Sequence, residues 1–164
     1  MVSDSRPSRL RPAGRVIVLD PDDRVLLFRY DDGPPNGRHW CTPGGGLNEG
    51  EDYSAGARRE LAEETGWTDV ALGEEIFERM LTMEYEDEIV RQQERFFLAR
   101  VPLARRGLGE VAAMHACDGI AAWHWWTLAE MDSTEDDIWP AELADLIRGI
   151  LGRPPASLPP SEDR

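Results

Sequence analysis

The sequence predicts a layered domain of the α/β or α+β class, in which one sheet lies between helices. Three observations predict it. Several short apolar or aromatic runs are typical of strands, and two segments with helical character stand at separate places among them. The 164 residues suffice for one domain with a real core and leave little room for a second.

The first expected elements form an antiparallel hairpin. Arg15 to Leu19 and Val25 to Tyr30 are runs of strand-forming residues, and Asp20 to Asp23 between them has the composition of a turn. An irregular loop rich in glycine and proline follows at residues 31–38. His39 to Pro43 is then a short extended segment that leads into three glycines.

A helix is expected directly after the glycines. Asp52 is suited to accept hydrogen bonds from the first amide groups as the N-cap, and Gly66 is suited to end the helix. The apolar Ala55, Leu61 and Ala62 fall toward one side of this helix. We therefore expect its carboxylates on the other side.

The second half of the chain contains three further expected strands and one helix. Residues 70–83 mix helix and strand signals and are interpreted as a strand, whereas residues 93–101 and 120–128 are clearer strands. Residues 102–118 are interpreted as a long loop. The leucines and isoleucine within residues 140–151 recur at helical spacing, which predicts a helix packed on the core.

Three tryptophans fall within the last of these strands. Because side chains alternate along a strand, Trp123 and Trp125 would share one face and Trp126 would lie on the other, and His124 would lie opposite the first two. Core packing is the expected role of these tryptophans, with stacking on a base as the alternative.

The ends of the chain differ in composition from its middle. Residues 1–12 are polar and contain proline, which predicts a flexible N-terminal arm. Residues 153–164 are rich in proline, which predicts a disordered tail. The expected domain therefore covers residues 13–152.

The composition excludes several classes of protein. A formal net charge of −14 argues against nonspecific nucleic-acid binding, although divalent cations would allow an acidic site to bind a phosphorylated small molecule. Apolar runs are too short to cross a bilayer and no secretory signal is present, so we expect a cytoplasmic protein without a membrane partner. Cys41 and Cys117 form no disulfide or metal-binding pattern and are expected to be reduced.

The chemistry is expected on the first helix. Glu60, Glu63 and Glu64 stand at positions i, i+3 and i+4, which places three like charges on one helix face, with Arg59 as the one obvious counter-charge nearby. A hard divalent cation with oxygen ligands would offset their repulsion. The alternative for such a triplet alone is an ordinary solvated helix face.

The spacing of this segment relative to the preceding glycines resembles a known family. Gly45, five residues, Glu51, seven residues and then the run Arg59 to Trp67 (RELAEETGW) resemble the Nudix box. Trp67 is the one departure, because an aliphatic residue is usual at this packing position. The resemblance extends over roughly residues 13–152 and implies an α/β/α sandwich with a mixed sheet, in which the box forms a loop-helix-loop that holds Mg²⁺ or Mn²⁺.

The resemblance also implies site residues. Glu63 and Glu64 would be the main carboxylate ligands of the metal, with the Gly44 carbonyl as a plausible third ligand. Glu60 would be a further ligand or the base that deprotonates water, so all three glutamates are expected to be catalytic.

Four other residues would support the site. Glu51 and Arg59 would form an ion pair that fixes the loop against the helix, and Gly45 and Gly66 would shape the two ends of the box. Many family members supply one more carboxylate from the loop before the late strand, but Gly119 stands near that position. The expected substitute as a metal ligand is Asp118, with Glu110 and Glu94 as other candidates.

The implied function is hydrolysis of a phosphoanhydride bond in a nucleoside diphosphate linked to another moiety: a nucleoside triphosphate, a dinucleoside polyphosphate or a nucleotide sugar. A non-catalytic nucleotide sensor and an isopentenyl-diphosphate-type isomerase that uses Cys41 are the alternatives. Tyr85 lies where family enzymes acting on dinucleoside polyphosphates tend to carry a tyrosine, but in this acidic segment it is as readily incidental. A homodimer would be common for the family.

Overall fold

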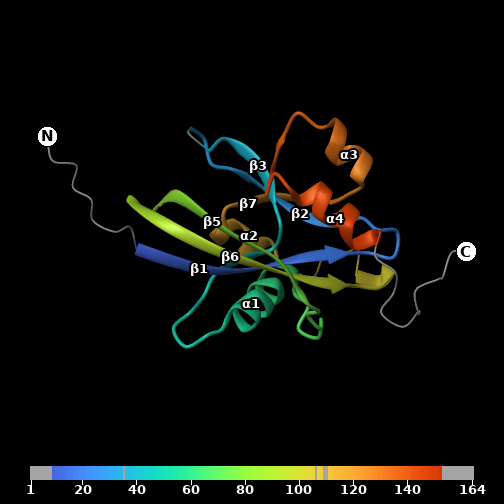
Figure 1. Ribbon diagram of the computed structural model, residues 1–164, viewed down its shortest axis with the longest axis horizontal. Coiled ribbons are helices and arrows are strands. Elements are labelled where there is room, and N and C mark those ends of the chain that lie inside the picture. The colour runs from blue at the N-terminus through green and yellow to red at the C-terminus, as the bar shows by residue number, and fades with distance from the viewer. Residues whose placement is uncertain (1–8, 35, 106, 109–110, 153–164) are drawn as a thin grey trace, which may run out of the picture.

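The computed structural model describes residues 9–34, 36–105, 107–108 and 111–152 (Figure 1). Its elements, in chain order, are β1 (Arg9–Leu19), β2 (Val25–Asp31), β3 (Arg38–Cys41), β4 (Gly44–Gly46), α1 (Tyr53–Thr65), β5 (Glu75–Tyr85), β6 (Glu88–Arg100), the 3₁₀ helix η1 (Leu103–Arg105), α2 (Ala112–Asp118), β7 (Ile120–Trp126), α3 (Leu128–Ser133), β8 (Asp137–Trp139) and α4 (Leu143–Leu151).

The strands of the described residues form one eight-stranded mixed sheet. Its main order is β5-β6-β1-β2-β3-β8, while β4 pairs with β1 and β7 pairs with β2. The β1–β6 and β3–β8 pairs are parallel, and the other pairs are antiparallel. The mixed sheet is therefore confirmed. The expected β1–β2 hairpin is also present, with Leu19 opposite Val25.

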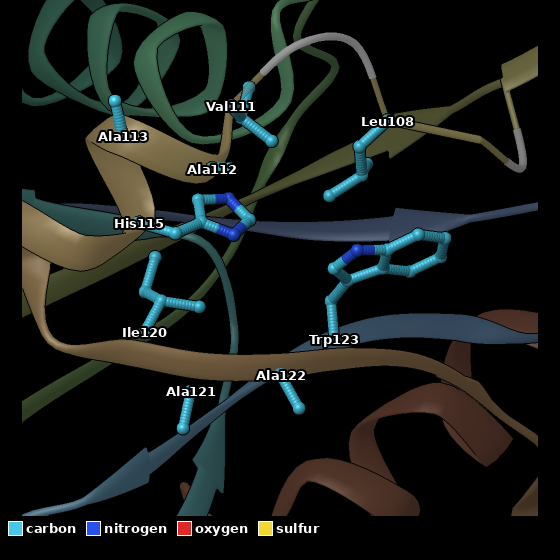
Figure 2. A pocket seen from close by; sticks show the side chains of 9 residues that line it. All are labelled: Leu108, Val111, Ala112, Ala113, His115, Ile120, Ala121, Ala122 and Trp123. Carbon is cyan, nitrogen blue, oxygen red and sulfur yellow. The ribbon is translucent and has the colours of Figure 1, made fainter.

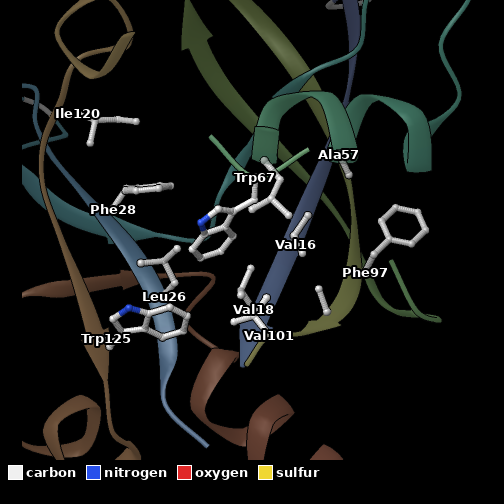
Figure 3. Close-up of a cluster of buried hydrophobic side chains, with 12 residues drawn as sticks. Val16, Val18, Leu26, Phe28, Ala57, Trp67, Phe97, Val101, Ile120 and Trp125 are labelled. Atoms are coloured by element: carbon white, nitrogen blue, oxygen red, sulfur yellow. The ribbon is translucent and has the colours of Figure 1, made fainter. Parts of the chain in front are cut away.

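Helices cover both faces of the sheet, as the sandwich prediction required (Figure 1). Val16 and Val18 of β1 point to one face and join a buried cluster with Ala57 of α1 (Figure 3). Ile17 points to the opposite face and joins a second cluster with Ile147 of α4. Alternation along one central strand thus builds two cores, and each fully buried aliphatic side chain contributes about 1.5–3 kcal/mol to folding.

The helix α1 lies directly on β1 because Gly14 has no side chain. A Cβ atom at Gly14 would lie 2.4 Å from the Tyr53 carbonyl oxygen and 2.8 Å from the Ala57 amide nitrogen. Both predicted ends of α1 are confirmed. The Asp52 carboxylate accepts a hydrogen bond from the Ala55 amide at 2.7 Å, and Gly66 adopts the left-handed conformation that ends the helix.

The prediction of which α1 residues face the core was wrong in one respect. Ala55 is exposed, whereas Ala57 and Leu61 are buried against the sheet. The contact at Gly14 turns the Ala57 side of the helix inward. One of the carboxylates, Glu64, is turned inward with it.

The N-terminal boundary of the domain lies earlier than expected. Strand β1 begins at Arg9 rather than near residue 13, because residues 9–12 pair in parallel register with residues 90–93 of β6. That partner strand is itself longer than the predicted residues 93–101. The rest of the expected arm, residues 1–8, and the expected tail, residues 153–164, lie outside the described residues.

Several shorter elements also differ from expectation. The expected loop at residues 102–118 contains η1 and α2, and α2 begins without a capping side chain that would have marked it. The short α3 and β8 were missed, although Thr127 and Glu130 form a capping box at the start of α3. The strand expected at residues 70–83 begins at Glu75 and extends to Tyr85.

The tryptophan prediction is confirmed in part. Trp125 is buried in the cluster with α1 and Trp126 in the cluster with α4, so they lie on opposite faces. Trp123, in contrast, is 40% exposed and does not belong to the core. Trp67, the unusual residue of the box, is buried and stacks on Trp125 with ring centroids 6.4 Å apart, which is a packing role.

A buried ionic cluster joins β1, β5 and β6. Glu94 is 1% exposed and accepts hydrogen bonds from Arg15 Nε at 2.8 Å, Arg79 Nε at 2.5 Å and Gln92 Nε2 at 2.7 Å. Burial alone would raise the pKa of Glu94, but the two guanidinium groups outweigh it and hold the pKa at about 2.

Across the described ranges, no helix has both the length and the apolar character needed to cross a membrane.

The Glu94→Gln variant is expected to lower the free energy of unfolding by about 3 kcal/mol at pH 7, because it leaves two arginines without their buried counter-charge. The pKa of Glu94 is lower in the folded protein than its ordinary value of 4.5. Its contribution is therefore complete above about pH 4.5 and is lost as the pH falls towards 2. Urea unfolding across this range, with the exposed Glu84→Gln as control, should show the difference between parent and Glu94→Gln shrinking. A difference that stays constant down to pH 3 would contradict this account.

Candidate functional site

Three carboxylates form a row on α1 that runs from the protein interior to solvent. The side chain of Glu63 is 39% exposed and that of Glu60 is 18% exposed, whereas Glu64 is 2% exposed. An ordinary solvated helix face would expose all three. The gradient instead indicates that the row lines the wall of a site whose inner end is Glu64.

The buried end of the row is held by the backbone of β4. The Gly44 amide donates a hydrogen bond of 2.8 Å to Glu64 Oε1, and the Tyr30 hydroxyl lies 3.5 Å from Glu64 Oε2. Burial raises the pKa of Glu64 to about 8, and the negative charges of Glu60 and Asp118 act in the same direction, while the Gly44 amide opposes them. A carboxylate in this position needs a nearby cation in order to be ionised at neutral pH.

The middle of the row rests against a glycine. A Cβ atom at Gly45 would lie 2.7 Å from Glu60 Cδ, so a larger residue would displace this carboxylate from its present position. Burial raises the pKa of Glu60 above its ordinary value, although Arg59 opposes the shift. Gly45 therefore shapes the site, as the sequence predicted, by making room for a side chain of α1.

Arg59 ties the loop to the helix. Its Nε donates to Glu51 Oε1 at 2.6 Å and its Nη2 donates to the Gly46 carbonyl oxygen at 2.9 Å. Its Nη1 lies 3.0 Å from Glu60 Oε1 and 3.3 Å from Glu63 Oε2. The predicted Glu51–Arg59 ion pair is present, and the same guanidinium also contacts two members of the carboxylate row.

The expected fourth carboxylate acts on the same row. Asp118 is the last residue of α2, and its charge contributes to raising the pKa of both Glu60 and Glu64. Gly119 follows it in the left-handed conformation. Of the other two candidates, Glu94 is engaged in the buried cluster described above, and Glu110 lies outside the described residues.

Nothing in the sequence indicated the role of His115. His115 Nε2 lies 2.6 Å from the Glu64 carbonyl oxygen, and its ring packs edge-on against Phe28 at 5.3 Å. This contact fastens α2 to the carboxyl end of α1. No motif marks it, because the two residues are 51 positions apart.

The donor atoms of the site suit a hard divalent cation. Carboxylate oxygens from Glu60, Glu63 and Glu64 are the ligands that Mg²⁺ and Mn²⁺ prefer. Burial is the main reason that the pKa of Glu64 is raised, and the charge of Arg15 offsets only part of that shift. Among the described residues, no three His, Cys, Asp or Glu side chains already enclose an ion-sized space. An ion held here would take its remaining ligands from water or substrate.

A cavity of about 930 Å³ opens between α2 and β7 (Figure 2). Its walls are mainly apolar, and they are formed by Leu108, Val111, Ala112, Ala113, His115, Ile120, Ala121, Ala122 and Trp123. None of these residues carries a carboxylate. The carboxylates of the candidate site therefore lie outside this cavity, and His115 is the residue that links the two regions.

Comparisons with known proteins agree with this geometry. A family model described as the NUDIX domain matches residues 9–147. An RNA pyrophosphohydrolase of Caulobacter vibrioides is 51% identical over 63 residues, which is 38% of this chain and 36% of the relative. An RNA pyrophosphohydrolase of Pelagibacter ubique is 30% identical over 99 residues, or 56% of this chain and 61% of the relative. The chain thus spans between about a third and three fifths of these relatives.

Solved structures show the same fold. A MutT protein from Methanosarcina mazei Go1 has a TM-score of 0.63 at 21% identity, with 88% of this chain and 95% of that chain covered. A C. elegans Ap4A hydrolase in a binary complex has a TM-score of 0.61 at 21% identity, with 86% and 95% covered. The NUDIX domain of Shewanella oneidensis NrtR, complexed with ADP ribose, has a TM-score of 0.59 at 18% identity, with 89% and 90% covered.

Addition of Mg²⁺ or Mn²⁺ at pH 8 is expected to raise the melting temperature of the protein, because an ion that binds only the folded state stabilises it. At one hundred times the dissociation constant the gain is about 2.7 kcal/mol. Thermal unfolding with and without the metal measures it. Glu64→Gln should lose most of the shift, whereas Glu135→Gln, which removes an exposed carboxylate distant in sequence, should keep it. Equal shifts in both variants would show that the row is not the binding site.

Proposed function

Because the chain belongs to the Nudix family, we propose that it is a divalent-metal-dependent hydrolase that cleaves a phosphoanhydride bond in a nucleoside diphosphate linked to another moiety. The observation that carries the proposal is the row of Glu60, Glu63 and Glu64, held against the glycines of β4 with its inner end buried. The family enzymes named above as RNA pyrophosphohydrolases and as an Ap4A hydrolase support hydrolysis of this type of bond.

Glu63 and Glu64 would hold Mg²⁺ or Mn²⁺, with the Gly44 carbonyl and Asp118 as further ligands. A bound divalent cation neutralises phosphate oxygens and lowers the pKa of a bound water molecule. The pKa of Glu64 near 8 means that this carboxyl holds a proton at neutral pH when no cation is present.

The reaction adds water across the anhydride. The water oxygen bonds to one phosphorus atom, the bond from that phosphorus to the bridging oxygen breaks, and the other phosphate leaves with the electron pair. Glu60 is the proposed acceptor of the water proton, because burial raises its pKa and makes it a stronger base than an exposed glutamate. Arg59 and Glu51 position this carboxylate through the loop and do not react themselves.

The substrate is proposed to be a nucleoside triphosphate, a dinucleoside polyphosphate or a nucleotide sugar. The names of the relatives add RNA to this set. The formal net charge of −14 opposes nonspecific binding of a nucleic acid, which favours a small nucleotide. A cytoplasmic location and a homodimer stay predictions from the sequence.

The two alternative functions are less well supported. The NrtR domain, whose solved structure contains ADP ribose, shows that this fold also accommodates binding of a nucleotide. The present chain, however, retains all three carboxylates of the row in a defined arrangement. For the isomerase, Cys41 would have to react, but burial raises the pKa of its thiol to about 11 and thus disfavours the reactive thiolate.

Release of phosphate products should be measured from nucleoside triphosphates, dinucleoside polyphosphates, ADP-ribose, nucleotide sugars and a 5′-triphosphate RNA, with and without Mg²⁺ or Mn²⁺. We expect metal-dependent turnover of one class. Glu63→Gln and Glu64→Gln should lower kcat/KM by about two to three orders of magnitude, because metal-ion stabilisation contributes several kcal/mol. Glu135→Gln is the control. Tight nucleotide binding without turnover of any compound would support the sensor instead.

The Cys41→Ala variant is expected to keep kcat/KM within about threefold of the parent, because the thiol is buried and its hydrogen-bond partner, at 4.0 Å, is Arg15 Nη1 rather than a group of the carboxylate row. The assay is the same product release on the best substrate. Loss of activity with an unchanged melting temperature would indicate that Cys41 takes part in the reaction, as the isomerase alternative requires.

A further inference from the structure

We propose that Arg11 binds a phosphate group beyond the two that flank the cleaved bond, so that the protein prefers substrates with three or more consecutive phosphates. The inference rests on the proposed function and names a substrate class for the same site. Arg11 lies near the beginning of β1, in the segment that sequence reasoning had assigned to a flexible arm.

A second cavity, of about 420 Å³, adjoins the carboxylate row. The beginning of β1 runs beside the turn that joins β5 to β6 (Figure 1), and residues of both segments line the cavity. Its lining residues come from β1, the end of β4 and the loop after it, α1, and the end of β5 with the turn after it: Arg9, Arg11, Pro12, Gly46, Leu47, Asn48, Glu60, Tyr85 and Glu86. Because Glu60 belongs both to this cavity and to the row, a ligand that fills the cavity reaches the reactive groups.

Arg11 is held in this cavity by neutral groups. Its Nη1 donates a hydrogen bond to Gln92 Oε1, and its guanidinium lies over the Tyr85 ring at 4.1 Å from the centroid. Within the described ranges, Arg11 makes no ion pair with a carboxylate. Its positive charge is therefore available to an anion.

Three other arginines of β1 and β5 are already paired with carboxylates. Arg15 and Arg79 share the buried carboxylate of Glu94, and Arg9 lies 3.4 Å from Glu88. The chain has a net charge of −14, and Arg11 is partly buried next to the carboxylate row without a carboxylate partner of its own. Such an arginine indicates a site for a negatively charged ligand.

The guanidinium and the carboxylate row lie over adjacent glycines. A Cβ atom at Gly46 would lie 3.0 Å from Arg11 Nη2, whereas a Cβ atom at Gly45 would lie 2.7 Å from Glu60 Cδ. The two side chains nevertheless form no ion pair with each other. An anion bound to Arg11 would thus lie next to the carboxylate row without occupying it. This position suits the third phosphate of a polyphosphate whose two reacting phosphates lie at the row.

The chemistry of the cavity favours phosphate over a base or a sugar. A guanidinium presents its donors as a planar fork that matches two oxygens of one phosphate. Tyr85 offers a ring face to Arg11, so the tyrosine supports the guanidinium rather than stacking on a base. The terminal ribose of ADP-ribose carries no charge that would use Arg11.

The test is binding of inorganic tripolyphosphate and of inorganic pyrophosphate in the presence of Mg²⁺, measured by calorimetry. Arg11→Gln should raise the dissociation constant of tripolyphosphate about tenfold more than that of pyrophosphate, since one charge-assisted contact is lost. Arg11→Lys, which keeps the charge without the fork, should lie between Arg11→Gln and the parent. Arg100→Gln, at an exposed arginine 3.9 Å from Asp23, is the control and should bind both ligands like the parent.

Equal weakening of both ligands by Arg11→Gln, or no binding of tripolyphosphate to the parent, would overturn the inference. The melting temperature of each variant shows whether a loss comes from unfolding. Since binding needs no turnover, the result is independent of whether the proposed hydrolysis occurs. On a substrate that is hydrolysed, Arg11→Gln should lower kcat/KM for a nucleoside triphosphate relative to ADP-ribose about tenfold, mainly through KM. An unchanged ratio would also count against the inference.

Discussion

The guanidinium of Arg59 contacts the carboxylates of Glu51, Glu60 and Glu63 and the carbonyl oxygen of Gly46. Like charges at one helix face repel each other, and the helix that carries them would be destabilised without a nearby cation. Arg59 provides only one positive charge against three negative ones. The arginine therefore holds the geometry of the loop and helix together but leaves an excess of negative charge, which a divalent cation is suited to neutralise.

The arrangement of Arg59 and the carboxylates depends on how closely α1 lies on the sheet. The missing side chain at Gly14 allows the helix backbone to contact β1, and the same approach brings Glu64 under β4, where the Gly44 amide donates to it. His115 then fastens α2 to the carbonyl of Glu64, so that Asp118 acts on the row from a third element. The site is thus assembled on a strand that is buried on both faces, which keeps its groups in place when charge is added or removed.

Much of this site could be predicted from the sequence because most of its residues lie close together along the chain. The spacing from Gly45 to Trp67 placed the helix caps and the Glu51–Arg59 pair correctly. The burial of Glu64 could not be predicted in the same way, because it depends on contacts between α1 and a strand some 40 to 50 residues earlier. The strand at residues 9–12 was missed for a similar reason, since its partner lies about 80 residues later and the segment itself is polar.

The same distant pairing explains why Arg11 carried no signal in the sequence. Along the chain it is one of several arginines in a polar stretch, but the β1–β6 register places it beside Gln92 rather than beside a carboxylate, whereas Arg15 lies next to Glu94. Two arginines on the same face of one strand therefore have different roles. Arg15 is paired with Glu94 and helps to hold the sheet together, whereas Arg11 keeps a positive charge next to an otherwise acidic site. A strongly acidic protein can in this way present both a cation site and an anion site to a single polyphosphate chain, with its net charge still opposing the long phosphate backbone of a nucleic acid.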